Sequence, residues 1–338
     1  MRISAVFAAL LSLVLVAPVP AFAWGATGHR IINGDAVRTL PDSVPPFIRT
    51  PDALSEITAL GPEADRDKGA GKPRDSDWDP AHFLDLEDNG TIGGTLALAH
   101  LPASREAYDT ALRNGVKPAN EYAVGFLPYE IVDGYELLVK DFAIWRVDSY
   151  AETHVAQANR AFFASDRQLR EMLVLRDIGY WGHFVADGSQ PLHVSVHFNG
   201  WGKYPNPNSY TQSKKIHAKF ETDFVSKYTS AEAVQSRIPT YVPSSAPILK
   251  RVENYLAATN SHVPQVYQLE GARAFDAATP AAVSFTVERL ADGAKTMRDL
   301  IADAYAESLS ARVGDPHINV RDVLSGKVTP THSVANGG

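Results

Sequence analysis

The sequence predicts an all-α protein built as one large domain. Apolar residues recur at helical spacing along most of the chain, whereas no segment shows the sustained two-residue alternation of a strand. The sequence also has no repeat of 20 to 50 residues and no glycine-rich phosphate loop. Hydrophobic residues make up 45% of the chain and charged residues 21%, which is ordinary for a globular protein.

Residues 1–23 predict a cleaved secretory signal. Arg2 is followed by a long apolar run and then by the small residues Ala21 and Ala23, which define a cut after Ala23. We therefore expect a secreted or periplasmic protein whose mature chain begins at Trp24. No later apolar run is long enough to span a bilayer, so no transmembrane segment is expected.

The first helix of the mature chain is predicted at residues 29–40, because its apolar positions have helical spacing and Pro41 follows. A second helix is predicted at 52–60, and residues 66–77 form a polar loop rich in Gly and charge. Further helices are predicted at 104–113, 120–147, 154–164, 166–187, 214–228, 248–259 and 280–310. The predicted domain covers residues 24–310, and we expect 311–338 to be a loosely packed polar tail.

Composition limits the chemistry that the protein can use. The chain has no cysteine, so an exported form has no disulfides, and a metal site must use histidine, carboxylate and backbone ligands. The 32 basic and 39 acidic residues become a net charge of −8 once Arg2 is removed with the signal. This balance provides no basic surface for sequence-independent duplex binding, so an anionic substrate would have to be attracted by bound metal.

Two histidine–carboxylate pairs with four-residue spacing are the densest chemical signal. His183 and Asp187 project from one face of a predicted helix, and Pro191 ends that helix so that His193 can turn back toward them. His217 and Glu221 repeat the spacing. One such pair alone is usually a solvated or hydrogen-bonded pair, but two pairs in a cysteine-free exported protein favour a metal centre.

Other potential ligands precede these pairs in the chain. His82 follows a proline turn, Asp65 precedes the polar loop, and His29 lies five residues after the expected terminus. The freed α-amino group of Trp24 would have a pKa of about 7.7 to 8, low enough for its lone pair to bind a metal. The remaining histidines lack a comparable carboxylate partner and are expected to be structural or surface residues: His100, His154, His197, His262, His317 and His332.

Four segments together resemble the S1/P1 nuclease and bacterial zinc-dependent phospholipase C superfamily. They are Trp24-Gly-Ala-Thr-Gly-His29, His82-Phe-Leu-Asp-Leu-Glu-Asp-Asn89, His183-Phe-Val-Ala-Asp187-Gly-Ser-Gln-Pro-Leu-His193 and His217-Ala-Lys-Phe-Glu221. The resemblance covers roughly residues 24–225. It implies a single-domain, multi-helix fold around a cleft that holds three Zn²⁺.

The resemblance also implies which residues hold each ion. The first zinc would be bound by Asp65, His82 and His183, and the second by His193, His217 and Glu221. The third would be bound by His29 and by the amino nitrogen and carbonyl oxygen of Trp24, with Asp187 bridging the first and third. Asp67 is the alternative to Asp65, because Glu63-Ala-Asp65-Arg-Asp67 differs from the Trp-Ala-Asp usual in the nucleases.

The implied activity is hydrolysis of a phosphodiester by a zinc-bound hydroxide oriented by Asp65, without a covalent intermediate. Single-stranded RNA or DNA is the favoured substrate, and no protein partner is implied. Two departures, the Phe198-Asn-Gly stretch and Glu221 in the last ligand position, favour the alternative, a phospholipase C that acts on phospholipid headgroups. The residues with which that enzyme holds choline are missing, however, since Thr27, Arg66 and Asp79 occupy their positions.

The loop that follows the central motif carries three aromatic residues, Trp201, Tyr204 and Tyr210. They are candidate substrate contacts that stack on bases, and the alternative is that they pack beneath the loop. A further reading, in which the metals are purely structural in a binding protein, is disfavoured because a structural zinc has four protein ligands and no open position.

Overall fold

A computed structural model describes residues 24–68, 70–71 and 73–332; the predicted signal lies outside these ranges. The predicted all-α class is confirmed, because helices account for most of the described chain. The strands that it contains form two short antiparallel pairs: β1 (Thr91–Ile92) with β2 (Leu96–Ala97), and β3 (Arg312–Val313) with β4 (Ile318–Asn319). None of the described helices combines the length and apolarity needed to cross a bilayer.

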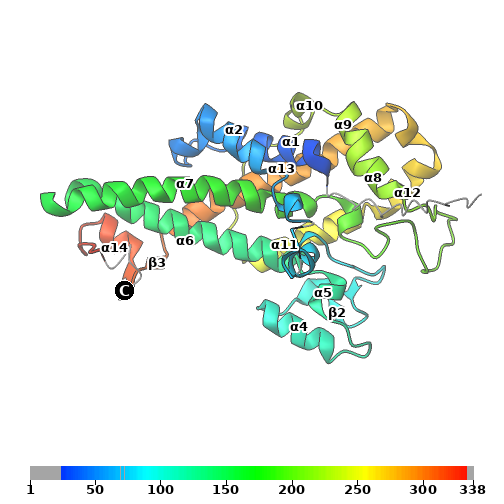
Figure 1. Ribbon diagram of the computed structural model, residues 1–338, viewed down its shortest axis with the longest axis horizontal. Helices are drawn as coiled ribbons and strands as arrows, with labels where there is room; N and C mark the ends of the chain where they lie inside the picture. Colours follow the sequence, from blue (N-terminus) through cyan, green and yellow to red (C-terminus); the bar gives the residue numbers. More distant parts are fainter. Residues whose placement is uncertain (1–23, 69, 72, 333–338) are drawn as a thin grey trace, which may run out of the picture.

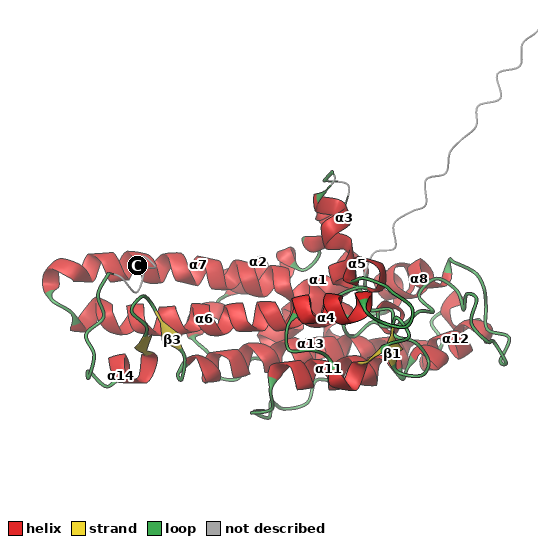
Figure 2. Ribbon diagram, turned by 90° about the horizontal axis from the view of Figure 1, so that it is seen from below, coloured by secondary structure: helices red, strands yellow, loops and turns green. Residues whose placement is uncertain are grey.

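The molecule is organised around two long antiparallel helices, α6 (Leu127–His154) and α7 (Gln157–Asp187), which run side by side in Figures 1 and 2. α13 (Pro280–Ser308) contacts both of them, and α11 (Ile248–Asn260) lies against α6. α1 (Gly25–Arg38) packs between α13 and α7, with α2 (Pro51–Leu60) covering α1 and α7.

Shorter helices surround this framework. They are α3 (Arg74–Trp78), α4 (Arg105–Arg113), α5 (Glu121–Val124), α8 (Ile216–Ala218), α9 (Val225–Tyr228), α10 (Ala231–Gln235), α12 (Val263–Gly271) and α14 (Val320–Leu324). A π-helical segment, Lys219–Phe224, joins α8 to α9. Short 3₁₀ turns at Ala64–Asp67, Asp79–His82 and Pro191–His193 complete the part of the fold that matters for the site.

Local sequence explains where several helices begin. The hydroxyls of Thr50, Ser104 and Thr279 accept hydrogen bonds from the backbone N–H three residues later, at distances of 3.2 to 3.3 Å. These N-caps satisfy amides that a helix leaves without partners. Proline follows Thr50 and Thr279 directly, and its fixed φ suits the first helical position.

Two predicted helix boundaries are wrong. The helix predicted at 120–147 is divided at Gly125, which has a φ of +83° and whose missing side chain would lie 2.0 Å from the carbonyl oxygen of Phe83. The helices predicted at 154–164 and 166–187 are one helix, α7, because Ser165 stays in the helix and its hydroxyl donates to the carbonyl of Ala161. Tertiary packing therefore overrides the local signal at both places.

The predicted loosely packed tail is also wrong for residues 311–332. Val313, Val320 and Val323 are buried, and they form an apolar cluster with Ala143 and Val147 of α6. The segment carries few apolar residues, so its composition reads as polar. The three valines nevertheless lie on the side of the segment that faces α6, and they cover a part of that helix that would otherwise face water.

Candidate metal centre

The predicted ligands come from seven segments of the chain, and the fold buries them together. α7 carries His183 and Asp187 in its last turns, and α1 brings His29 against them. Asp65, His82 and His193 lie in the three 3₁₀ turns, while His217 and Glu221 come from α8 and the π-helical segment. Each of these side chains is at most 7% exposed. A π-helical turn at this position is typical of functional sites.

The first group of donor atoms surrounds the end of α7. His183 Nε2 lies 3.0 Å from His82 Nδ1 and 3.4 Å from Asp187 Oδ2, and the latter two atoms are 3.1 Å apart. Asp65 Oδ1 is 3.8 Å from His183 Nε2. Asp65, His82 and His183 thus offer three ligand atoms within 4.8 Å of one another, enough to hold one metal ion.

A second group is formed by His193, His217 and Glu221. Glu221 Oε2 lies 2.8 Å from His217 Nε2 and 3.6 Å from His193 Nε2, and the two nitrogens are 3.1 Å apart. Gln190, inside the central motif, donates from Nε2 to Glu221 Oε2 at 3.0 Å. This amide therefore helps to fix the orientation of the carboxylate.

His29, His183 and Asp187 make up the third group. The rings of His29 and His183 are stacked with centroids 3.7 Å apart, and His29 Nε2 is 3.6 Å from Asp187 Oδ1. Trp24 lies next to this group, fully buried, with its indole N–H donating to Ala186 O and Ser189 Oγ. These bonds anchor the expected start of the mature chain at the end of α7.

Three histidines are held by the ring nitrogen that faces away from the centre. The Nδ1 of His183 is 2.8 Å from Gly61 O, that of His193 is 2.7 Å from His82 O, and that of His217 is 3.0 Å from Phe198 O. A carbonyl can only accept, so each Nδ1 carries the proton and each Nε2 presents a lone pair to the centre. Hydrogen bonds of this kind, formed by the ring nitrogen that does not bind the metal, orient histidine ligands at metal sites.

The donor set fits metal ions better than it fits an empty core. Asp187 Oδ1 and Glu221 Oε1 are buried and form no hydrogen bond in the described part of the chain. Burial, and then the neighbouring Asp65, raise the pKa of Asp187 well above its usual value, so its ionised form needs the positive charge that a metal would supply. In the second group the lone-pair nitrogens of His193 and His217 face each other at 3.1 Å. Two ligands of one tetrahedral zinc, each about 2.0 to 2.1 Å from it, lie roughly 3.3 Å apart.

Protonation at the centre also favours metal binding. Burial, and then the neighbouring His183 and Lys68, lower the pKa of His82 well below its usual value, and burial lowers that of His183 to about 4. Burial opposes ionisation of Glu221, but His217 and His193 lower its pKa to about 2. Neutral imidazoles and an ionised carboxylate are the forms that bind a metal.

The structure separates Asp65 from Asp67. Asp65 faces His183, and its Oδ1 accepts a hydrogen bond from Lys68 Nζ at 2.7 Å. Asp67 turns to the other side of the 3₁₀ turn, where its Oδ2 accepts from Arg74 at 2.7 Å and from Tyr180 Oη at 2.8 Å. Of the two alternatives, only Asp65 lies among the three groups of donor atoms.

A cavity of about 310 Å³ opens beside the second group. His193 and His217 form one wall, Phe83 and Phe198 add aromatic surface, and Lys68 and Asp85 are among its polar groups. Burial raises the pKa of Asp85 to about 7. Sequence reasoning missed Lys68, Phe83 and Asp85 as site residues, although each lies within three residues of a predicted ligand.

The aromatic residues predicted to contact substrate do not line this cavity. Trp201 is 6% exposed, and its ring lies against Tyr210 and Tyr267 with centroids 4.6 and 5.0 Å away. Trp201 and Tyr210 therefore pack beneath the loop, the alternative considered above, because together with Tyr267 they form its apolar floor. Tyr204 is 39% exposed and remains open to solvent.

His197 shows how a histidine outside the three groups is used. It is buried, with Nε2 2.8 Å from Asp88 Oδ1 and Nδ1 2.8 Å from Trp201 O. Both ring nitrogens are thus occupied by hydrogen bonds, and its ring stacks on Trp201 with centroids 3.7 Å apart. His197 fixes the aromatic loop, as a structural histidine would.

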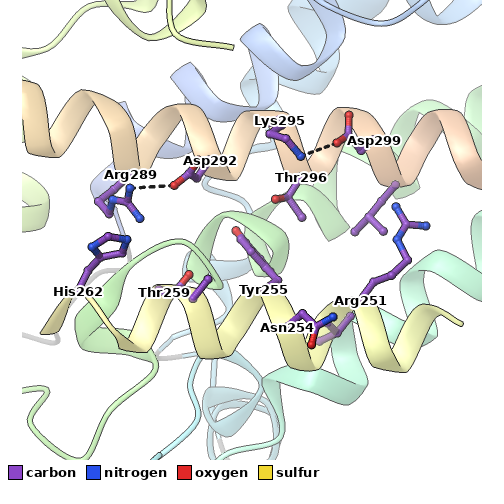
Figure 3. Close-up of a pocket in the computed structure, with 13 residues that line it drawn as sticks. Arg251, Asn254, Tyr255, Thr259, His262, Arg289, Asp292, Lys295, Thr296 and Asp299 are labelled. Atoms are coloured by element: carbon purple, nitrogen blue, oxygen red, sulfur yellow. Dashed lines mark hydrogen bonds and ion pairs between the residues drawn. The ribbon is translucent and has the colours of Figure 1, made fainter. Parts of the chain in front are cut away.

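Another cavity, of about 360 Å³, lies between α11 and α13 (Figure 3) and contains none of the predicted ligands. Its charged groups already have partners: Arg289 pairs with Asp292 at 2.9 Å and Lys295 with Asp299 at 2.7 Å inside the cavity, and Arg251 pairs with Asp303 outside it at 2.7 Å. The cavity therefore offers no convergent set of free charges. The clustered donor atoms at the end of α7, rather than this larger space, mark the candidate site.

Sequence comparisons provide no family assignment: no protein-family model matches the chain, and no curated protein matches it. The chemistry of the site must therefore be argued from its geometry. That geometry combines buried nitrogen and carboxylate donors with an adjoining cavity that contains a cationic and an aromatic side chain.

Proposed function

We propose that this protein is a secreted, zinc-dependent phosphodiesterase of the S1/P1 nuclease type that hydrolyses single-stranded RNA or DNA. The observation that carries the proposal is the convergence of three buried groups of donor atoms, two of which share His183, beside one open cavity. A purely structural site would not need three adjoining groups and an accessible pocket.

The three groups would hold three Zn²⁺ as the resemblance implies. Asp65, His82 and His183 would bind the first ion, and His193, His217 and Glu221 the second. His29 and the mature terminus at Trp24 would bind the third, with Asp187 between the first and third. Zinc bound there would supply Lewis acidity and would lower the pKa of a water ligand toward about 7.

The surrounding residues have separate tasks in this proposal. Asp65 would accept a hydrogen bond from the attacking water at the oxygen that does not bind metal and so would orient it. Lys68 is bonded to Asp65 at 2.7 Å and also lines the cavity, so its ammonium can hold a phosphate oxygen. Burial lowers the pKa of Lys68, but the neighbouring Asp65 outweighs burial and raises it. The amine therefore stays protonated.

The cavity favours a nucleotide over a lipid headgroup. Phe83 and Phe198 offer faces on which a base can stack, and Asp85 offers a carboxyl group that can hydrogen-bond to the base edge. Stacking of this kind contributes about 1 to 3 kcal/mol per base. Phe198, which is 42% exposed, is the feature that also suits a phospholipase C, because an exposed ring near the site can enter a lipid surface.

The test compares substrates with the processed, zinc-loaded protein. Release of nucleotides from single-stranded RNA or DNA should exceed cleavage of phosphatidylcholine vesicles, and Asp65→Asn should lower kcat by about 100-fold or more. Asp67→Asn is the matched control, since Asp67 bonds to Arg74 and Tyr180 instead of the donor groups; its kcat should remain within a few-fold.

The outcomes separate the alternatives. Cleavage of lipid alone would assign the protein to the phospholipase branch. If the zinc-loaded protein cleaves neither class of substrate, the metals are structural. Equal loss of activity in Asp65→Asn and Asp67→Asn would remove the special role given to Asp65.

A further inference from the structure

A separate cavity of about 340 Å³ lies between α3, α6 and α7, and we call it the α3 pocket. Its lining includes Arg74 and Trp78 of α3, Glu130 and Asp133 of α6, and Arg176 and Tyr180 of α7. Figure 2 shows α3 standing out from the layers of long helices. None of the predicted metal ligands lines this pocket.

The α3 pocket nevertheless adjoins the candidate metal centre. The Trp78 ring meets Phe184 edge-on with centroids 6.3 Å apart, and Phe184 lies 5.1 Å from the ring of His82. Trp78 and Asp79 are consecutive residues, and Asp79 lines the cavity beside His193. The two cavities therefore adjoin each other at Trp78 and Asp79, so one single-stranded nucleic acid can occupy both.

The charges of the pocket leave two carboxyl groups unmatched. The arginines already have partners at 2.7 Å: Arg74 pairs with Asp67, and Arg176 with Asp177. Glu130 and Asp133, by contrast, form no ion pair and no side-chain hydrogen bond in the described ranges. Burial, and then the nearby Asp133, raise the pKa of Glu130 to about 7. Arg105, which also lines the pocket, is held by Glu121 at 2.7 Å, so none of the arginines of the pocket forms an ion pair with these two carboxyl groups.

The walls are flat and aromatic. Trp78 and Tyr180 both line the pocket, with Arg74 positioned over the Trp78 ring at 4.8 Å and Arg176 over the Tyr180 ring at 5.0 Å. The side chains of Arg74 and Arg176 are 52% and 59% exposed, so they form the rim. A planar ligand would match this arrangement if its hydrogen-bond donors faced Glu130 and Asp133 and its negative charge faced Arg74 and Arg176 at the rim.

We propose that the α3 pocket binds a second base of a single-stranded nucleic acid and prefers guanine; this inference rests on the proposed nuclease function. The Watson–Crick edge of guanine presents N1–H and the N2 amino group side by side, and the Glu130 carboxylate, the form that predominates above a pH of about 7, can accept both. Adenine and cytosine place a ring acceptor next to their amino group, which a carboxylate repels. Arg74 and Arg176 at the rim lie where the flanking phosphates would pass.

The experiment uses the full processed, zinc-loaded protein and two substitutions on α6. Glu130→Gln removes the unmatched charge while it keeps the size of the side chain. Glu136→Gln is the matched control, because Glu136 lies on the same helix, is exposed and does not line the pocket. Two measurements follow: cleavage of oligoadenylates that contain one guanine at successive positions, and equilibrium binding of free guanosine and adenosine.

We expect kcat/KM to rise about tenfold when guanine occupies one position displaced from the cleaved bond. Glu130→Gln should reduce this preference to within about twofold and weaken guanosine binding, while the Glu136→Gln protein keeps both the preference and the binding. Guanosine binding provides a readout that does not depend on catalysis.

Three results would each contradict either the guanine site or the nuclease function. Cleavage without any guanine preference, with guanosine binding insensitive to Glu130→Gln, would overturn the inference and leave the nuclease proposal intact. Failure to cleave any nucleic acid, with guanosine binding still lost in Glu130→Gln, would overturn the nuclease function and support the pocket as a base site. Tighter binding of tetramethylammonium than of guanosine would overturn the inference in favour of a cationic headgroup.

Discussion

Buried carboxyl groups in this protein have opposite protonation states because their neighbours differ. Glu221 faces two histidines, which lower its pKa to about 2 although the side chain is buried. Asp148 of α6 is also buried, and burial together with the neighbouring Asp166 of α7 raises its pKa to about 8. At neutral pH the first is an anion prepared for a cation, and the second holds its proton.

The raised pKa of Asp148 predicts a pH-dependent stability. The native state holds this proton up to a pH of about 8, whereas the unfolded chain releases it near 3.8. Its stabilising contribution is therefore complete below about pH 4 and is lost as the pH rises toward 8, by at most about 1.4 kcal/mol per pH unit. Asp148→Asn should remove this dependence and raise the unfolding free energy at pH 8.

Urea unfolding at pH 4 and pH 8 measures the effect. The difference between wild type and Asp148→Asn should be small at pH 4, where both states hold most of the proton, and should be larger by several kcal/mol at pH 8. If the two proteins differ equally at both values, Asp148 does not change its protonation on folding.

At the scale of elements, close packing of α6 against α7 and against the C-terminal segment defines the long part of the molecule. Gly134 of α6 permits the first contact, since a Cβ there would lie 1.9 Å from Trp181 of α7. On another part of α6, Val320 and Val323 bury Ala143 and Val147. The C-terminal segment thus completes the packing of this helix.

Shortening Val320 tests this role. Val320 is fully buried, so Val320→Ala should lower the unfolding free energy by about 1 to 3 kcal/mol through lost burial and a residual cavity. Val242→Ala is the matched control, because Val242 is 72% exposed and the same change there should have little effect. Chemical denaturation of both proteins gives the comparison, and equal values would mean that the C-terminal segment contributes nothing to the core.

At the scale of the whole molecule, the candidate metal centre lies where segments distant in sequence meet. Trp24, at the expected start of the mature chain, contacts Ala186 and Ser189 more than 160 residues later. The donor groups around it concentrate carboxylates and lone pairs inside the protein. Bound metal would neutralise this charge, so occupancy and global stability are linked.

Chelation should therefore destabilise the protein. At a free metal concentration 1,000 times Kd, a single site adds about 4 kcal/mol of stability, and a kcal/mol corresponds to roughly 2 °C in a chain of this size. Treatment with EDTA should lower Tm by about 8 °C or more, and added zinc should restore it. An unchanged Tm, with zinc shown to have left the protein, would contradict this linkage.

The sequence by itself determined the helical class and the two His–carboxylate pairs. Both are local properties: four-residue spacing places His183 beside Asp187, and His217 beside Glu221, whatever the rest of the chain does. The caps at helix starts are local for the same reason. The family resemblance added the expected grouping of the ligands, which local spacing does not provide.

Only the tertiary structure decided which residues meet across the chain. It separated Asp65 from Asp67, buried Trp201 under its loop and brought Trp78 and Glu130 to one pocket. These outcomes depend on contacts between segments that are far apart in sequence, and such contacts are set by how whole helices pack rather than by the residues beside them. A pattern in the sequence can name a ligand, but the packing of α1, α3, α6 and α7 determines what that ligand faces.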